Sequence, residues 1–95
     1  MTADPRWAAR IAQNTPTGAI QAPLLITQGA DDRIVLPVVT LDHARGRCAR
    51  GERVDLRVYP GETHLTLAAR AGPDILDWTA ARFAGEPVLD GCRGL

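Results

Sequence analysis

The chain has 95 residues, with 11 basic and 11 acidic side chains and 45% hydrophobic residues, which are the proportions of one small globular domain or part of a larger one. Its formal net charge of zero gives no reason to expect nucleic acid as a partner. No apolar run approaches the roughly 20 residues of an integral membrane segment. The sequence contains neither serine nor lysine, so a serine nucleophile would have to come from residues outside this chain.

The first expected elements are a helix and a strand. The helix starts at Asp4, because an Asp N-cap followed by proline is a common helix start. Trp7 and Ile11 lie one turn apart on its apolar stripe, which is expected to be core. The run Leu24–Thr27 lies between a proline and a glycine. Its unbroken Leu-Leu-Ile sequence is typical of a parallel strand that is buried on both faces.

A second helix is expected to begin at Leu36-Pro37 and to end at Gly51, a residue that commonly stops helices. Its apolar residues recur on one face, and Arg47 is expected to point largely elsewhere. The segment Val54–Tyr59 alternates apolar and polar residues. That pattern predicts a strand with one packed face, near the edge of a sheet.

A last helix is expected to start at Gly72-Pro73, after a separate helical turn over Leu65–Arg70, and to place Trp78 and Phe83 in the core. The predicted order is helix–strand–helix–strand–helix, an α/β fold with two parallel strands joined by a helical crossover. Fewer than three strands rarely form a stable sheet alone. We therefore interpret residues 1–95 as one partial domain, the end of a larger fold.

Two residues with catalytic chemistry follow the two predicted strands. Asp32 lies three residues after Gly29, and His64 follows the Pro60-Gly61 turn. Because the carboxyl ends of adjacent parallel strands meet at one edge of a sheet, the two loops should emerge together. A carboxylate that accepts a hydrogen bond from one imidazole nitrogen leaves the other nitrogen free to act as a general base. The acid also precedes the histidine, as it does in α/β hydrolases.

Each of these residues alone has a simpler explanation. An Asp-Asp pair in a turn often bonds its own backbone, and a single loop histidine is more often a surface residue than a catalyst. The joint pattern of strand, Gly-x-x-Asp, helix, strand and Pro-Gly-x-x-His favours the catalytic interpretation. Asp32 fits this register, whereas Asp31 is expected to bond the loop backbone.

The stretch Ala22–His64 resembles the C-terminal part of α/β-hydrolase-fold esterases, lipases and prolyl-oligopeptidase-type peptidases. A wider set of motifs consists of Asn14-Thr15-Pro16, Gln28-Gly29-Ala30-Asp31-Asp32 with Val35-Leu36-Pro37, Cys48 before Gly51, Val58-Tyr59-Pro60-Gly61-Glu62-Thr63-His64-Leu65, and Asp77-Trp78-Thr79 to Cys92. Together these motifs resemble the secretory lipase family of fungi and actinobacteria. The resemblance implies that Asp32 and His64 belong to a Ser-His-Asp triad, that acyl esters are the substrates and that the complete protein is secreted.

The nucleophile elbow of that family, Gly-x-Ser-x-Gly, does not occur in this sequence. We therefore expect the chain to be the C-terminal segment of a lipase or carboxylesterase whose N-terminal part supplies the serine, and to be inactive alone. Two alternatives stay open, namely a non-catalytic truncated module and a fragment of a prolyl-oligopeptidase-like serine peptidase. No cofactor or metal is expected, because the sequence has no dinucleotide fingerprint, P-loop or ligand pair. Met1–Arg10 contain no signal-peptide core, so no export signal is expected in this chain.

The two cysteines permit one disulfide. Cys48 lies on the packed face of the expected crossover helix, and Cys92 follows a helix that can run back beside it. Given the resemblance to secreted enzymes, we expect a Cys48–Cys92 bond that contributes about 3–4 kcal/mol. The alternative is two free thiols, with Cys48 as a small core residue. The segment Gly46–Gly51 is no cysteine elbow, because it is helical and would place the nucleophile between acid and histidine.

Overall fold

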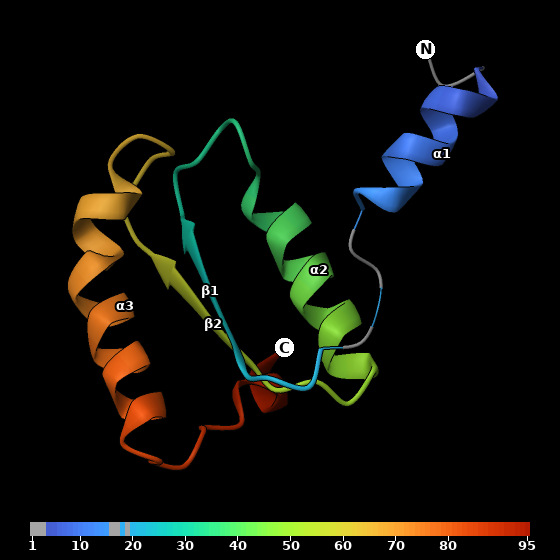
Figure 1. Cartoon of the computed structure of the whole chain (residues 1–95). Coiled ribbons are helices and arrows are strands. Elements are labelled where there is room, and N and C mark those ends of the chain that lie inside the picture. The colour runs from blue at the N-terminus through green and yellow to red at the C-terminus, as the bar shows by residue number, and fades with distance from the viewer. Residues whose placement is uncertain (1–3, 16–17, 19) are drawn as a thin grey trace.

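Two parallel strands lie between two helices, one on each face of the sheet (Figure 1). This computed structural model describes residues 4–15, 18 and 20–95, so Pro16 of the first family-like motif lies outside the described residues. The predicted order of three helices and two parallel strands is confirmed. The elements are α1 (Pro5–Gln13), β1 (Leu24–Gly29), α2 (Pro37–Ala49), β2 (Val54–Tyr59), α3 (Leu67–Phe83) and the short 3₁₀ helix η1 (Gly91–Gly94).

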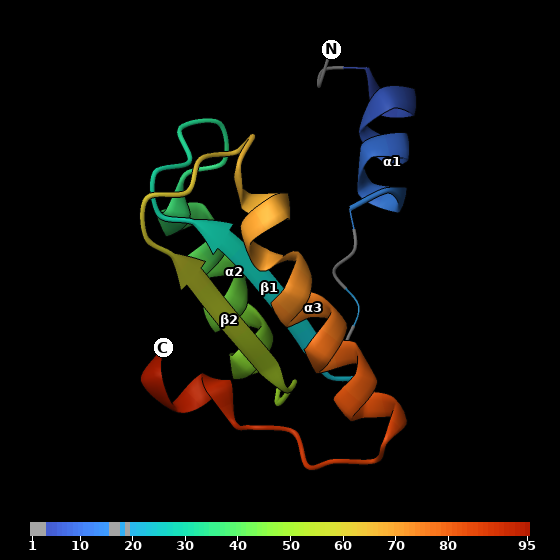
Figure 2. The same ribbon diagram turned by 90° about the vertical axis from the view of Figure 1, so that its left-hand side faces the viewer.

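The sheet register brings the ends of both strands to the same level. β1 pairs with β2 from Leu24 opposite Val54 to Gly29 opposite Tyr59. The helical crossover α2 covers one face, and α3 covers the other (Figures 1 and 2). As a result, the loops that follow the two strands emerge beside each other at the carboxyl edge of the sheet (Figure 2).

The buried core is small, and it differs from the predicted one. β1 is not buried on both faces, since Leu24 to Ile26 are only half-buried and the described residues supply a neighbouring strand on one side alone. Trp7 is 55% exposed and Phe83 is 90% exposed, so neither belongs to the core. α1 packs against no other described element and stands apart from the sheet (Figure 1). Among the residues that the structure describes, the fully or nearly buried apolar ones are Ala44, Val54, Tyr59 and Ala71.

α3 is one continuous helix from Leu67 to Phe83 with Pro73 inside it, which corrects the predicted start at Gly72. A proline inside a helix removes one backbone hydrogen bond, and its ring usually clashes with the Cβ of the preceding residue. Gly72 has no Cβ, so that clash is relieved. The hydroxyl of Tyr59 donates to Asp74 Oδ2 at 2.7 Å and holds the helix on the sheet beside the proline.

β2 follows the predicted alternation only in its first part. Val54 is fully buried, but Val58 is 49% exposed and Tyr59 is 6% exposed. Tyr59 is covered because Arg70 of α3 lies over its ring, 5.3 Å from the ring centre, in addition to the bond with Asp74. The packing of α3 therefore overrides the sequence alternation at the carboxyl end of this strand.

Arg47 is buried, contrary to its predicted position on the open side of α2. Its guanidinium donates to Glu52 Oε1 at 3.2 Å and to the Gly18 carbonyl at 2.8 Å, and both charged side chains are nearly inaccessible. Glu52 also accepts the backbone N–H of Ile20. The turn at the end of α2 brings the pair together, because Gly51 has a φ of 81° and Glu52 N–H returns to the Arg47 carbonyl.

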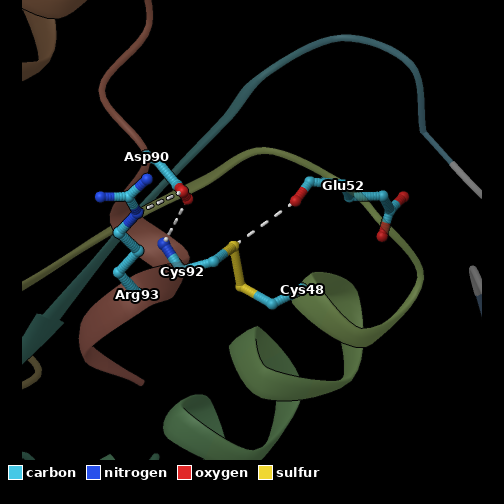
Figure 3. Close-up of a disulfide and its surroundings, with 5 residues drawn as sticks. All are labelled: Cys48, Glu52, Asp90, Cys92 and Arg93. Carbon is cyan, nitrogen blue, oxygen red and sulfur yellow. Dashed lines mark hydrogen bonds and ion pairs between the residues drawn. A yellow bond between two sulfur atoms is a disulfide. The ribbon is translucent and has the colours of Figure 1, made fainter.

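The structure contains the expected disulfide between Cys48 of α2 and Cys92 of η1 (Figure 3), with a Cα–Cα distance of 5.7 Å. Asp90 caps η1 by accepting the N–H of Cys92 at 3.2 Å. The bond fixes the C-terminal tail beside the start of β2. Within the part of the chain that the structure describes, no helix is both long and apolar enough to span a bilayer.

Candidate active site

The loops after β1 and β2 touch through their backbones. Ala30 N–H donates to the Tyr59 carbonyl, and Asp31 N–H donates to the Glu62 carbonyl, both at 2.9 Å. A Cβ on Gly29 would lie 2.4 Å from the carbonyl oxygen of Glu62. Only glycine therefore permits this approach, which accounts for the glycine at the end of the apolar run.

Asp32 is held at the base of these two loops with 5% of its surface exposed. Its Oδ1 accepts the backbone N–H groups of Ile34 at 2.8 Å and Val35 at 2.9 Å. Its Oδ2 lies 3.0 Å from His64 Nδ1. The structure thus brings together the two predicted catalytic residues. Asp31 instead is exposed, and its contact with the other loop is made by the backbone N–H, not by the carboxylate.

Several interactions act on the pKa of Asp32. Burial is the largest single influence and raises the pKa, but the hydrogen bonds from Val35 N–H, from His64 and from Ile34 N–H outweigh it. The pKa of the Asp32 carboxyl therefore lies below its ordinary value. A carboxylate that stays ionised is a hydrogen-bond acceptor only, so it favours a proton on Nδ1 of the histidine.

A tight turn after β2 and the residues just before α3 hold the backbone of His64 in place. Gly61 has a φ of 78°, and Glu62 N–H closes the turn on the Tyr59 carbonyl. Thr66 Oγ1 accepts the N–H of Thr63 at 2.8 Å, which fixes the backbone on either side of the histidine. The His64 side chain is 44% exposed. No described residue bonds its Nε2, so this nitrogen faces solvent with its lone pair when Nδ1 carries the proton.

Gln28 supports the site and was missed by sequence reasoning. It is 3% exposed, and its Nε2 donates to the carbonyls of Gly29 at 3.0 Å and Val35 at 2.9 Å. Its Oε1 accepts from the Thr40 hydroxyl of α2 at 2.5 Å. The side chain thereby closes the acid loop onto the strand and the helix. A buried polar residue at the end of an otherwise apolar strand is the sequence signal for such a role.

A hollow of about 380 Å³ adjoins the pair and is lined by both Asp32 and His64, by the outer side of β1 and by α3. Among the described residues, no hydroxyl or thiol bonds to His64 Nε2, and both sulfurs are in the disulfide. The hydroxyls of Thr63 and Thr66 in the same loop bond each other and the loop backbone instead. The site therefore contains an acid and a base but no nucleophile in contact with the base.

The fold and the site define a small mixed α/β domain that carries a carboxylate–imidazole pair at the carboxyl edge of its parallel strands. Comparisons with protein-family models, with curated proteins and with solved structures gave no match to this chain.

Proposed function

We propose that this chain supplies the acid and the base of a serine-hydrolase triad, whose serine lies outside these 95 residues. The observation that carries the proposal is the 3.0 Å contact between Asp32 Oδ2 and His64 Nδ1, with Nε2 left open to solvent. In this proposal the chain is the C-terminal portion of an α/β-hydrolase domain and resembles the secretory lipases.

The proposed roles follow from the geometry. Asp32 keeps the proton of the imidazole on Nδ1 and stabilises the imidazolium that forms during the reaction. His64 Nε2 takes the proton of the serine hydroxyl as its oxygen attacks the ester carbonyl, and then gives that proton to the departing alcohol. Water repeats the two proton transfers when the acyl group is released. Each transfer needs only the free nitrogen that the structure leaves exposed.

Exposed apolar side chains in the two loops that carry the pair favour acyl esters as the substrate class. The residues that follow Asp32 in the chain are unusually exposed for their type, and Leu65 beside the histidine is 87% exposed. Exposed apolar patches mark surfaces that bind apolar ligands or partners. These residues are Ile34, Val35 and Leu36 after Asp32, and Leu65 after His64. The disulfide is compatible with the secreted location that belongs to this proposal.

A non-catalytic module is the second candidate, and the lack of serine in the sequence favours it. A labelling experiment distinguishes the two functions. In cells that produce this protein naturally, the gene would be tagged, and the tagged protein would be purified and treated with a fluorophosphonate, which labels activated serines. A labelled serine on the purified polypeptide or its bound partner is expected. Esters with short and long acyl chains should then be cleaved in preference to a prolyl peptide.

The same labelling in a His64→Ala variant should be lost, because the serine loses its general base. His43→Ala is the matched control, since His43 is the other histidine and is exposed on α2. Labelling that is absent from the wild type, or that survives in His64→Ala, would establish the non-catalytic module instead. The purified 95-residue chain by itself should show neither labelling nor ester cleavage.

A further inference from the structure

A second hollow, of about 520 Å³, lies between β2, the last turns of α3 and the tail that follows them. This end of α3 points away from the two catalytic loops (Figure 1), and none of the residues around the hollow lines the one beside His64. The volume is within the roughly 300–1,000 Å³ of small-molecule sites in proteins. A ligand bound here would be independent of the catalytic pair and of the proposed function.

The tail that forms one wall of this hollow is anchored at both ends. α3 ends in a Schellman turn, in which Gly85 N–H returns to the Arg82 carbonyl at 3.2 Å and Glu86 N–H to the Ala81 carbonyl at 3.0 Å. At the other end, the disulfide through Cys92 fixes η1 to α2 (Figure 3). The wall is therefore held in place by the fold.

The guanidinium of Arg82, which lines the hollow, makes few bonds. It lies over the Trp78 ring, 5.0 Å from the ring centre, and this cation–π contact fixes its position. Its Nη2 donates to the Pro87 carbonyl at 3.4 Å, and its Nε is buried and bonded by no described residue. A guanidinium has five N–H donors. Arg82 therefore has more donors than the described residues have acceptors for it.

Carboxylates alternate with arginines around the same hollow. Arg57 Nη2 donates to Asp55 Oδ2 at 3.0 Å. That pairing is the main reason why the pKa of Arg57 lies above its ordinary value; burial opposes the shift, and the charge of Asp74 on α3 adds to it. Asp77 is exposed, and no described residue bonds its carboxylate. The hollow thus presents donors and acceptors side by side, not a patch of one sign.

We infer that this hollow binds a neutral polyhydroxylated molecule, a small sugar. Each hydroxyl group both donates and accepts hydrogen bonds, so it can bond a guanidinium and a carboxylate at the same time. The C–H faces of a sugar ring need apolar surface beside these polar groups. Ala81, Pro87 and Leu89 supply it in the same wall.

The charges around the hollow disfavour ionic ligands. The carboxylates outnumber the arginines there, which opposes an anion. The guanidinium of Arg82 forms no ion pair with a described carboxylate, so its charge opposes a cation. A zwitterion needs positive and negative groups in two separate clusters, whereas Arg57 lies among carboxylates of both β2 and α3. A neutral ligand with many hydroxyls meets all three conditions.

Tryptophan fluorescence measures the binding. Trp7 and Trp78 are the two tryptophans of the chain, and α1, which carries Trp7, packs against no other described element. A Trp7→Phe chain therefore reports on Trp78 alone. The probes are glucose, galactose and maltose, and at least one of them should change the emission in a saturable way. No saturable change with any of the three overturns the inference.

Variants of the Trp7→Phe chain test the polar groups. Arg82→Gln should weaken the binding by at least about tenfold, because donors to the ligand are lost. Arg45→Gln, at an exposed position on α2, is the matched control and should bind as the parent does. Equal affinity in these two variants overturns the inference.

An exposed acidic residue keeps the test valid if Arg82→Gln does not fold. Asp77→Ala should weaken the binding by at least about threefold, because an acceptor is lost, and Asp42→Ala on α2, also exposed, is its control. An affinity that is unchanged in Asp77→Ala contradicts the proposed site.

Charged probes test the class of ligand. Sodium butyrate, ethylammonium chloride and glycine should each bind at least about tenfold more weakly than the best sugar, because each brings a charge that the mixed wall does not compensate. A charged probe that binds as tightly as the sugar would assign the hollow to an ionic ligand and overturn the inference. These titrations involve neither His64 nor a serine, so their failure and a failed fluorophosphonate experiment are distinguishable.

Discussion

The β2 edge of the sheet is tied to the rest of the molecule by more interactions than the β1 edge. On the β2 side, a disulfide joins α2 to the tail, and Tyr59 bonds α3. On the β1 side, Leu24 to Ile26 are half-buried, and two hollows of about 380 and 270 Å³ lie along the strand. The catalytic pair lies where the two sides meet. The difference teaches that the geometry of the pair depends on local hydrogen bonds in the two loops, whereas stability depends more on the contacts of the β2 side.

The largest loss of stability is expected from breaking the buried ion pair between Arg47 and Glu52. Glu52→Ala leaves the Arg47 guanidinium buried without its carboxylate, which costs about 3–5 kcal/mol. Urea unfolding followed by circular dichroism measures the change. Arg93→Ala is the control, because its ion pair with Asp90 is largely exposed and such pairs contribute about 1 kcal/mol or less. Equal losses in the two variants would contradict the importance of burial.

The second largest loss of stability is expected from removing the disulfide on the β2 side. The double variant Cys48→Ala with Cys92→Ala is expected to lose about 3–4 kcal/mol of unfolding free energy, because the unfolded chain regains the entropy of an open loop. The measurement is urea unfolding of wild type and variant, with the wild type repeated in reductant. A stability that is unchanged by reductant, together with thiols that alkylate before reduction, would show that the bond does not form.

Gly29→Ala tests the contact between the two catalytic loops. The added Cβ would meet the Glu62 carbonyl, and we expect a loss of about 1–3 kcal/mol as the backbones move apart. The His64 Nδ1 proton resonance should move toward that of a free imidazole. Gly46→Ala is the control, because nothing lies within 4 Å of a Cβ there and alanine in a helix gains about 0.5–1 kcal/mol over glycine. A similar response in both variants would contradict the tight crossing of the loops.

The fall in unfolding free energy at acidic pH should depend on Asp32. Its pKa in the folded state lies below the ordinary value of 3.8, so the unfolded state binds protons first and stability rises with pH. The contribution is present above the ordinary value and is lost as the pH falls through the folded-state pKa. Asp32→Asn should flatten this part of the curve, which urea unfolding at a series of acidic pH values measures. Asp31→Asn, an exposed neighbour, should leave it in place.

The predicted adjacency of the site residues agrees with the structure for a local reason. Strand, Gly-x-x-Asp, helix, strand and Pro-Gly-x-x-His are short-range signals, and parallel pairing then brings the loops together. A polar residue at the end of an apolar strand signals a supporting role for Gln28, but its partners Val35 and Thr40 were not predictable, because they lie in other elements. Their contact depends on how α2 packs on the strand.

The sequence by itself determined the order and the start of most elements, because capping, proline placement and apolar runs act over a few residues. Asp4 caps α1 as predicted, and β2 spans the predicted Val54–Tyr59. Only the tertiary structure decided which side chains are buried. Arg47 is enclosed and Phe83 is exposed, since burial is set by what packs against a residue from distant parts of the chain.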